Sequence, residues 1–343
     1  MDLTAGMSAE VDEVAEEPLH DQFMEGANIW LWDGRGRIAL PRVAVDAIGS
    51  RWGEAHMVSV NLALPGGRVL MVRTLGAPHP ALDERGRPRI RGAGPLRFHC
   101  LEPFRRWRLT FDGLAGDTTI EEQIAHRLGG PGSVPAPTVP VRFDIEMDMT
   151  VTPFVAGSYE PEGTVLSTEH RFEQLCSASG QVGIGGETIA FQGGGLRIRR
   201  KGTMKRSDYS DWMGHVWMSA QFPGGRAFGM DVFHPRPDGS VRYQEGWLLD
   251  DGEILPAKFV EAPWKKDWIA GGEDVSFTLR TKRGDTRLAA TTWLTTVSPV
   301  TEPPDGRTPF PPVQQGIVSY EWDGVQAYGM MERSSPAEID PGR

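Results

Sequence analysis

The segment Val141–Val151 alternates strictly between apolar and polar residues, and this pattern does most to set the fold class. A period of two puts one face of an extended chain on a core and the other in water, which is typical of a strand in an antiparallel sheet. Similar β-rich runs lie at residues 58–64, 69–73, 107–111, 196–200, 216–222, 227–233, 241–249, 275–280, 288–297, 317–322 and 325–331.

Glycine and proline are abundant, with 42 and 27 copies among the 343 residues, and they favour turns over long helices. Asp-Gly pairs, which are a strong hairpin signal, recur between the β-rich runs. One modest helix is expected at residues 118–128, where Thr119 and Glu122 fit a capping pair. The sequence therefore predicts an all-β protein, and its length favours two domains.

A Pro-Gly-Gly-Arg turn occurs twice, at Pro65–Arg68 and at Pro223–Arg226, and each copy follows a strand-like run. The copies start 158 residues apart, at positions 65 and 223, which is close to half the chain. Pro-Gly-Gly is also a common hairpin turn, but the residues upstream of the two copies match as well. They are Trp52 and His56 before the first copy and Trp212 and His215 before the second.

A duplicated β domain is the interpretation that these matching segments favour. We expect one domain at residues 19–160 and a second at residues 161–334. Residues 1–18 are acidic and lack aromatic side chains, so we expect them to form a disordered tail, as we do residues 335–343.

The formal net charge of −10 argues against a nucleic-acid partner, because nucleic-acid-binding surfaces are usually basic. The two cysteines, Cys100 and Cys176, are too few for a disulfide framework or a thiolate zinc site, so we expect buried, reduced thiols. No apolar run approaches the roughly 20 residues that span a membrane, and the N-terminus lacks a signal peptide. The cytoplasm is therefore the default location, without stable membrane insertion.

No motif points to a cofactor or a metal. The glycine-rich stretches at residues 183–186 and 193–195 are not complete dinucleotide-binding motifs, and no P-loop, nucleophile elbow or zinc-protease motif occurs. The eight histidines form no close pair of the His-x-His type. The sequence thus shows no cofactor requirement.

Chemically active side chains are densest between Asp208 and Trp217. If residues 214–222 form a strand, His215 and Trp217 share one face with Ser219 and Gln221, while the other face is an ordinary apolar core. The polar face fits either solvent or the lining of a ligand cavity. The cluster contains Asp208, Tyr209, Asp211, Trp212, His215 and Trp217.

Glu245 is a further candidate acid. On a strand it shares a face with Tyr243 and Trp247, which makes it either an edge charge or a desolvated acid. Asp231 is the next candidate.

Two arginines and two residues further upstream have both functional and structural interpretations. Arg199 and Arg206 fit either hydrogen bonds to the carboxylates or to a substrate oxygen, or ordinary salt bridges. His170 and Glu173 open the expected second domain, and either one also fits a hydrogen bond between domains.

A resemblance to a known superfamily enters between Gly195 and Trp264. The residues that carry it are Arg199–Gly202, Gly214–Trp217, Phe222–Gly229, Pro235–Gly239, Glu245–Trp247 and Val260–Trp264. This stretch resembles the lipocalin-like superfamily of hydroxyneurosporene synthase (carotenoid 1,2-hydratase), tocopherol cyclase and AttH-type proteins, and within it a bacterial branch. Weaker matches extend the resemblance from about His20 to Ser334.

The resemblance implies an all-β chain of two consecutive lipocalin-like antiparallel β-barrel or sandwich domains, with pockets for hydrophobic ligands. A hydratase or cyclase needs an acid that protonates a double bond and aromatic faces that stabilise the resulting cation. A carboxyl group can be that acid near neutral pH when burial raises its pKa. The resemblance implies a cofactor-independent hydratase, isomerase or cyclase that acts on a hydrophobic, unsaturated, terpenoid-like molecule.

Two other functions remain open: a non-catalytic lipocalin-like carrier of hydrophobic ligands, and a lyase or isomerase of an aromatic catabolite. The expected partner is a hydrophobic small molecule, and a homodimer is an open possibility. The predicted catalytic residues are Asp208, Asp211, His215, Asp231 and Glu245. The predicted substrate-binding residues are His170, Arg199, Arg206, Tyr209, Trp212, Trp217, Tyr243 and Trp247.

Overall fold

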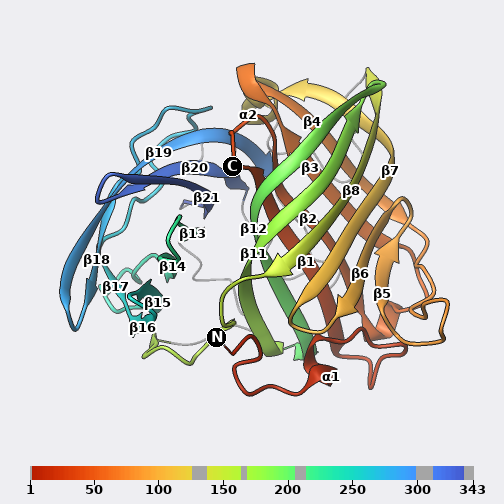
Figure 1. Ribbon diagram of the computed structural model, residues 1–343, viewed down its shortest axis with the longest axis horizontal. Helices are drawn as coiled ribbons and strands as arrows, with labels where there is room; N and C mark the ends of the chain where they lie inside the picture. The colour runs from red at the N-terminus through yellow and green to blue at the C-terminus, as the bar shows by residue number, and fades with distance from the viewer. Residues whose placement is uncertain (1, 126–136, 164–167, 205–213, 299–311, 336–343) are drawn as a thin grey trace.

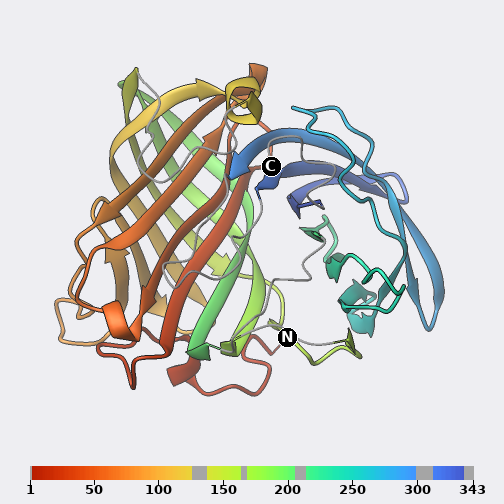
Figure 2. The ribbon, with the colours of Figure 1, turned by 180° about the vertical axis from the view of Figure 1, so that it is seen from behind.

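The computed structural model describes residues 2–125, 137–163, 168–204, 214–298 and 312–335 (Figures 1 and 2). These residues form two large antiparallel sheets, which confirms the all-β prediction. The helices among them are short: α1 (Ala9–Asp12), α2 (Ile120–Ala125) and two 3₁₀ turns. Thr119 and Glu122 make the expected reciprocal capping bonds at the start of α2, each 3.2 Å long.

The first sheet closes on itself. Its strands follow the order β4-β3-β2-β1-β12-β11-β8-β7-β6-β5, and β4 also pairs with β7, which closes a barrel of eight strands. Figure 1 shows this barrel, with the β5–β6 hairpin extending its wall beside β7. The strands are β1 (Phe23–Asp33), β2 (Ala39–Ile48), β3 (His56–Ala63), β4 (Arg68–Gly76), β5 (Ile90–Ala93), β6 (Leu96–Glu102), β7 (Arg106–Thr119), β8 (Thr138–Met149), β9 (Phe154–Val155), β11 (Thr168–Ile184) and β12 (Glu187–Met204).

Apolar side chains fill the interior of the barrel. On β8 the odd-numbered residues from Val141 to Met149 are buried and the even-numbered residues between them are not, as the alternation predicted. The same alternation on the other strands supplies the rest of a single core, which also includes the buried thiols of Cys100 and Cys176. Because a barrel of this size can be filled by its own side chains, its interior serves as a hydrophobic core.

The second sheet is an open, strongly curved half-barrel in the order β10-β15-β14-β13-β21-β20-β19-β18-β17, with β16 paired to β15. One of its faces forms a core of its own around Met218, Phe228 and Tyr320. The other face packs against the barrel. The strands are β10 (Glu162–Gly163), β13 (His215–Gln221), β14 (Ala227–Phe233), β15 (Tyr243–Asp250), β16 (Glu253–Pro256), β17 (Lys258–Glu261), β18 (Phe277–Thr281), β19 (Gly284–Ser298), β20 (Val313–Trp322) and β21 (Val325–Arg333).

The two Pro-Gly-Gly-Arg segments form the same kind of turn, one joining β3 to β4 and the other β13 to β14. The Leu64 N–H donates to the Arg68 carbonyl over 2.9 Å, and the Phe222 N–H donates to the Arg226 carbonyl over 2.8 Å. Both turns need glycine, because two successive residues adopt a positive φ that other residues disfavour. These are Gly66 and Gly67 (both +79°) and Gly224 and Gly225 (+88° and +92°).

The sheets divide the chain later than the boundary expected near residue 160. Strand β11 pairs with β8 and β12 pairs with β1, so the first sheet extends to Met204. Between β9 and β11 the chain crosses to the second sheet, where β10 pairs with β15. The division into domains at residues 19–160 and 161–334 stays a prediction.

The N-terminal segment, residues 2–17, is not the disordered tail that the sequence predicted. It packs into one end of the barrel, where α1 lies in Figure 1, and the side chains of Asp12 and Val14 are buried there. The prediction failed because the acidic composition of this segment does not reveal the buried arginines elsewhere in the chain with which its acids pair. Of the expected tail at residues 335–343, Ser335 is buried, and residues 336–343 lie outside the described part of the chain.

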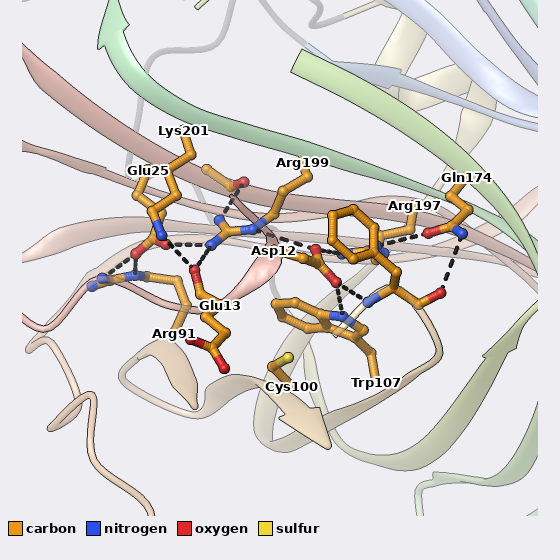
Figure 3. A network of polar contacts seen from close by, with 12 residues as sticks. Asp12, Glu13, Glu25, Arg91, Cys100, Trp107, Gln174, Arg197, Arg199 and Lys201 are labelled. Atoms are coloured by element: carbon orange, nitrogen blue, oxygen red, sulfur yellow. Dashed lines mark hydrogen bonds and ion pairs between the residues drawn. The ribbon is translucent and has the colours of Figure 1, made fainter. Parts of the chain in front are cut away.

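A network of charges holds the segment in place (Figure 3). Asp12 forms an ion pair with Arg197 and accepts hydrogen bonds from the Phe104 N–H (2.5 Å) and the Trp107 indole (3.0 Å). Arg199 forms a second ion pair, with Glu25, which also binds Arg91.

The arginines keep the acids of this network ionised. Burial acts to raise the pKa of Asp12, but the charges of Arg197 and Arg199 outweigh it, and the pKa falls below its ordinary value. Burial also acts to raise the pKa of Glu25, but the charges of Arg199 and Arg91 outweigh it, so this pKa is lowered as well. The barrel end is therefore filled by ionised groups that pair with one another.

Replacement of Asp12 by alanine is expected to lower the free energy of unfolding by roughly 3–5 kcal/mol, because it leaves Arg197 buried without its carboxylate. Denaturant titration followed by circular dichroism measures this change. The matched control is Glu10→Ala, which alters an exposed carboxylate of the same segment and is expected to change stability by less than about 0.5 kcal/mol. Equal effects of the two variants would contradict the assignment.

Candidate active site

A row of polar residues crosses the second sheet on the face that packs against the barrel. On β13, Val216 and Met218 point into the sheet's own core, while Trp217 belongs to the core between the sheet and the barrel. The two faces predicted for this strand are therefore correct, and its polar face is covered by the barrel. The row contains Gln315 on β20, Glu332 on β21, Trp217 on β13, Asp231 on β14 and Glu245 on β15, and all five are buried.

Strand β11 of the barrel faces this row with Arg171 and Glu173. These residues alternate with Phe172 and Gln174, which point toward the charged network at the barrel end. The Trp217 indole N–H donates to Glu173 Oε2 over 3.0 Å and so joins the second sheet to the barrel. One interpretation of Glu173 was a hydrogen bond between domains, and the structure contains such a bond between the barrel and the second sheet.

The Arg171 guanidinium lies between two carboxyl groups. Its Nη2 is 2.6 Å from Glu173 Oε1 and 3.9 Å from Asp231 Oδ2. The guanidinium also lies near the Trp217 ring, 5.7 Å from its centroid. The second oxygen of Asp231, Oδ1, is buried without a hydrogen-bond partner. Two buried acids therefore share one cation.

Both acids are shifted toward the protonated form. Burial raises the pKa of Glu173 to about 7, against the opposing charge of Arg171, and the nearby Asp231 raises it further. Burial also raises the pKa of Asp231 to about 6, again against Arg171. Because the two groups interact, they titrate as a pair. The pair retains a proton in the range where ordinary carboxyl groups have lost theirs.

Glu245 is held by three donors. Its oxygens accept hydrogen bonds from the N–H groups of Gly157 and Tyr159, each 2.7 Å long, and from the Tyr243 hydroxyl at 2.6 Å. Burial raises the pKa of Tyr243, so its hydroxyl keeps the proton that it donates. Glu245 thus ties the crossing segment after β9 to the second sheet.

His215 lies between Ser334 and Glu332. The Ser334 Oγ accepts from the His215 backbone N–H over 3.1 Å and lies 2.7 Å from Nδ1, while Nε2 lies 3.1 Å from Glu332 Oε1. Burial opposes ionisation of Glu332, but the hydrogen bond from His215 and the charge of Arg42 lower its pKa to about 2. Glu332 is therefore an ionised acceptor that orients the imidazole.

Indole rings line the same space. Trp30 on β1 meets Trp217 edge to face, with ring centroids 4.9 Å apart. Trp247 lies over Gly229, where an added Cβ would come within 2.6 Å of the indole nitrogen. The ring nitrogens of Trp30 and Trp247 have no hydrogen-bond partner. This part of the interface combines aromatic faces with unused hydrogen-bonding groups.

A pocket of about 380 Å³ opens at the β19 side of the same interface. The first Pro-Gly-Gly-Arg turn forms one wall with Gly66 and Gly67, and β19 forms another. Leu294 of this lining also belongs to the core that contains Trp30 and Trp217. The pocket therefore adjoins the space between the two sheets.

Six of the predicted site residues come together here, in what we call the interfacial cluster. It consists of Arg171, Glu173, His215, Trp217, Asp231, Tyr243, Glu245, Trp247 and Glu332. The predictions had omitted Arg171 and Glu332 and had not counted Glu173 among the site residues. The positions of Arg171 and Glu173, two residues apart on one strand, were a usable signal. Glu332 lies just before Ser334, where the weaker matches to the superfamily end.

Other predicted residues lie elsewhere. Arg199 is part of the charged network at the barrel end, where its guanidinium forms an ion pair with Glu25 and donates a hydrogen bond to the Glu13 carbonyl (Figure 3). It is therefore separated from the interfacial cluster. The strand register places His170 on the face of β11 opposite Arg171 and Glu173. The predicted residues that lie outside the described part of the chain are Arg206, Asp208, Tyr209, Asp211 and Trp212.

The described residues contain no group of three or more His, Cys, Asp or Glu side chains arranged to hold a metal ion. None of the helices in this part of the chain has both the length and the apolar character that crossing a membrane requires.

Known proteins share this fold at low sequence identity. Residues 41–337 match the model of a family described as a domain of unknown function, DUF7064. The crystal structure of an AttH candidate from Nitrosomonas europaea has a TM-score of 0.58 at 14% identity, covering 92% of this chain and 94% of that one. Kievitone hydratase from Nectria haematococca has a TM-score of 0.53 at 12% identity, covering 96% and 94%.

These likenesses confirm the fold that the resemblance implied, and at such identities they show the fold alone. No curated protein sequence matches the chain.

The raised pKa values of Glu173 and Asp231 predict that stability falls as pH rises. The folded protein holds their protons more tightly than the unfolded chain does, so their contribution is complete below the ordinary carboxyl pKa and is lost as pH rises through about 6 to 7. Denaturant titrations between pH 4.5 and 8 measure this loss.

Glu173→Gln removes one of the two titrating groups and is expected to flatten this dependence. The exposed Glu187→Gln serves as the control and is expected to keep the wild-type profile. A Glu173→Gln profile as steep as that of the wild type would show that Glu173 holds no such proton.

Proposed function

The chain belongs to the DUF7064 family, and we propose that it is a cofactor-independent acid–base enzyme of the hydratase, isomerase or cyclase type. Its substrate is a hydrophobic, unsaturated small molecule that binds between the barrel and the second sheet. Kievitone hydratase, one of the proteins that share the fold, is named for a hydration reaction, which is consistent with this class of chemistry.

The observation that carries the proposal is the pair of buried carboxyl groups, Glu173 and Asp231, that share the Arg171 guanidinium. A group that protonates a double bond near neutral pH must still hold its proton there, and it must be able to take one back. A carboxyl pair with pKa values of about 6 and 7 meets both requirements. Asp231 is the better placed donor, because its Oδ1 is not engaged by another residue.

Hydration then needs no group beyond these acids and a water molecule. The proton of Asp231 adds to one carbon of the double bond, and the hydroxyl of water adds to the other. The remaining proton of the water returns to the carboxylate, which restores the pair. Isomerisation or cyclisation uses the same two proton transfers without the water.

The surroundings influence which double bonds react. Aromatic faces such as those of Trp30 and Trp217 each stabilise nearby positive charge by about 0.5–2 kcal/mol. Arg171 opposes a free carbocation at the acid because like charges repel. The combination favours a double bond that is polarised by a conjugated oxygen over an isolated alkene.

The remaining members of the interfacial cluster act as positioning residues. Trp217 fixes Glu173, and Glu332 with Ser334 fixes the imidazole of His215. Glu245 fixes Tyr243 and the crossing segment. Their hydrogen bonds keep the site in one geometry.

Replacement of Asp231 by asparagine is expected to lower turnover roughly 100-fold or more, the typical contribution of a general acid. Wild type and variant are incubated with sets of terpenoids, steroids and phenolic aromatics, and mass spectrometry with chromatography detects products. A gain or loss of one water reports hydration or dehydration, and an unchanged mass with altered retention reports an isomer.

The matched control is Asp323→Asn, which changes an exposed aspartate of the same sheet and is expected to retain wild-type turnover. Circular dichroism checks that both variants fold. Wild-type protein that binds members of these sets but converts none of them would favour the carrier function over an enzyme. Full turnover by a folded Asp231→Asn variant would exclude Asp231 as the acid.

A further inference from the structure

We propose that the site recognises a hydroxyl group of its substrate through Asn28 and Gln315, at a distance from the acid pair. This inference rests on the proposed function and narrows its substrate class: the substrate is an elongated, unsaturated molecule with an alcohol or phenol at one end, rather than a plain hydrocarbon.

Strand register places Asn28 on the barrel face that carries Glu173. Glu173 pairs with Ile198 on β12, and Ile198 pairs with Asn28 on β1. Residues paired directly across strands point to the same side of a sheet. Asn28 is 2% exposed, so it lies within the interface between the two sheets.

Gln315 belongs to the facing row on the second sheet. It pairs with Glu332, which pairs with Trp217, so all three point toward the barrel. The two elements meet directly, since β1 contacts β21 and β2 contacts β20. Next to Asn28 on β2 stands Ala44, whose apolar side chain offers the amide no hydrogen bond.

Both side chains have polar atoms that lack a hydrogen-bond partner. Neither the amide nitrogen nor the amide oxygen of Asn28 has one, although both are buried. Gln315 donates its amide nitrogen to Glu332 over 2.5 Å, and because Glu332 is ionised and accepts only, this orientation is fixed. The Gln315 Oε1 is therefore an acceptor that remains without a donor.

A hydroxyl group fits these unused atoms. It can donate to the oxygen of Gln315 or Asn28 and accept from the Asn28 nitrogen at the same time. A carbonyl or carboxylate accepts only and would leave Oε1 of Gln315 unpaired. Buried polar groups without partners are unfavourable, so a ligand that supplies both functions is selected over one that supplies neither.

The strand spacing sets the length of the substrate. Gln315 and Asp231 lie three strands apart in their row, which corresponds to about 14 Å at the usual spacing of neighbouring strands. Glu173 and Asn28 lie two strands apart, or about 10 Å. Trp30 and Trp217 lie along this path. A molecule of about 10–14 Å fits the interval between acid and amide.

Titration calorimetry with matched probes tests the inference. The probes are 4-hydroxystilbene against stilbene, which differ only by the hydroxyl group, and farnesol against β-farnesene, the hydrocarbon that differs from farnesol by the loss of one water. The wild-type protein is expected to bind at least one hydroxylated probe tenfold or more tightly than its hydrocarbon partner. In Asn28→Leu the preference is expected to fall below threefold.

The melting temperatures of Asn28 variants distinguish a role in ligand recognition from a structural role. Because the Asn28 amide has no internal partner, Asn28→Leu is expected to keep or raise the melting temperature. Asn28→Ala, with less bulk, provides a second variant if leucine prevents folding. The matched control is Thr296→Val, which removes a buried hydroxyl that already bonds to the Gln315 carbonyl and is expected to retain the tenfold preference.

Three results would overturn the inference: no hydroxyl preference for either probe pair in the wild type, an unchanged preference in both folded Asn28 variants, or a lower melting temperature in Asn28→Leu with the preference intact. Asp231→Asn is expected to keep the preference while losing turnover. If that variant keeps its turnover, the proposed acid is wrong while hydroxyl recognition still stands on the binding data.

Discussion

The pairing of β4 with β7 decides where chemistry can occur in this protein. That pairing closes the first sheet, and a closed barrel of eight strands is narrow enough for its own side chains to fill. The interfacial cluster therefore lies outside the barrel, on the outer face of β11 and on the second sheet that faces it. The second sheet covers the outer face of β11. Burial between the two sheets raises the pKa values of Glu173 and Asp231.

Two buried polar systems lie on opposite faces of the same strands, and they differ in how many cations their acids have. In the network at the barrel end, Asp12 and Glu25 are matched by arginines, and both have lowered pKa values. In the interfacial cluster, two acids share Arg171, and atoms of Asp231 and Asn28 have no partner. Buried acids that are matched by cations suit a structural plug, whereas an unengaged carboxyl oxygen and a side-chain amide without partners suit a binding site.

Local pattern was enough to predict much of the fold. The alternation at Val141–Val151, the glycines of the two hairpins and the capping pair at Thr119 each depend on a few neighbouring residues, and each was predicted correctly. The faces of β13 followed from the same alternation. Asp231 and Glu245 were identified as candidates because each stands on a β-rich run, and in Glu245 the flanking aromatics marked the buried face.

Contacts between residues far apart in the sequence could not be predicted from local pattern. The partnership of Glu173 with Trp217 joins residues 44 apart, and that of Asp12 with Arg197 joins residues 185 apart. Nothing within either local segment specifies these contacts. For this reason the N-terminal segment was interpreted as a tail, Arg199 was placed with the substrate-binding residues, and Arg171 was not considered.

The pairing of β1 with β12 has a consequence for how the chain is made. Because Phe23 lies opposite Thr203, the first strand must wait through the synthesis of about 180 further residues before the neighbour that completes its side of the barrel exists. Until then one edge of β1 is open, and such an edge invites pairing with other chains. Closing a loop of this length is slow, so the open edge of β1 persists through most of the chain's synthesis and is a place where two nascent chains can pair.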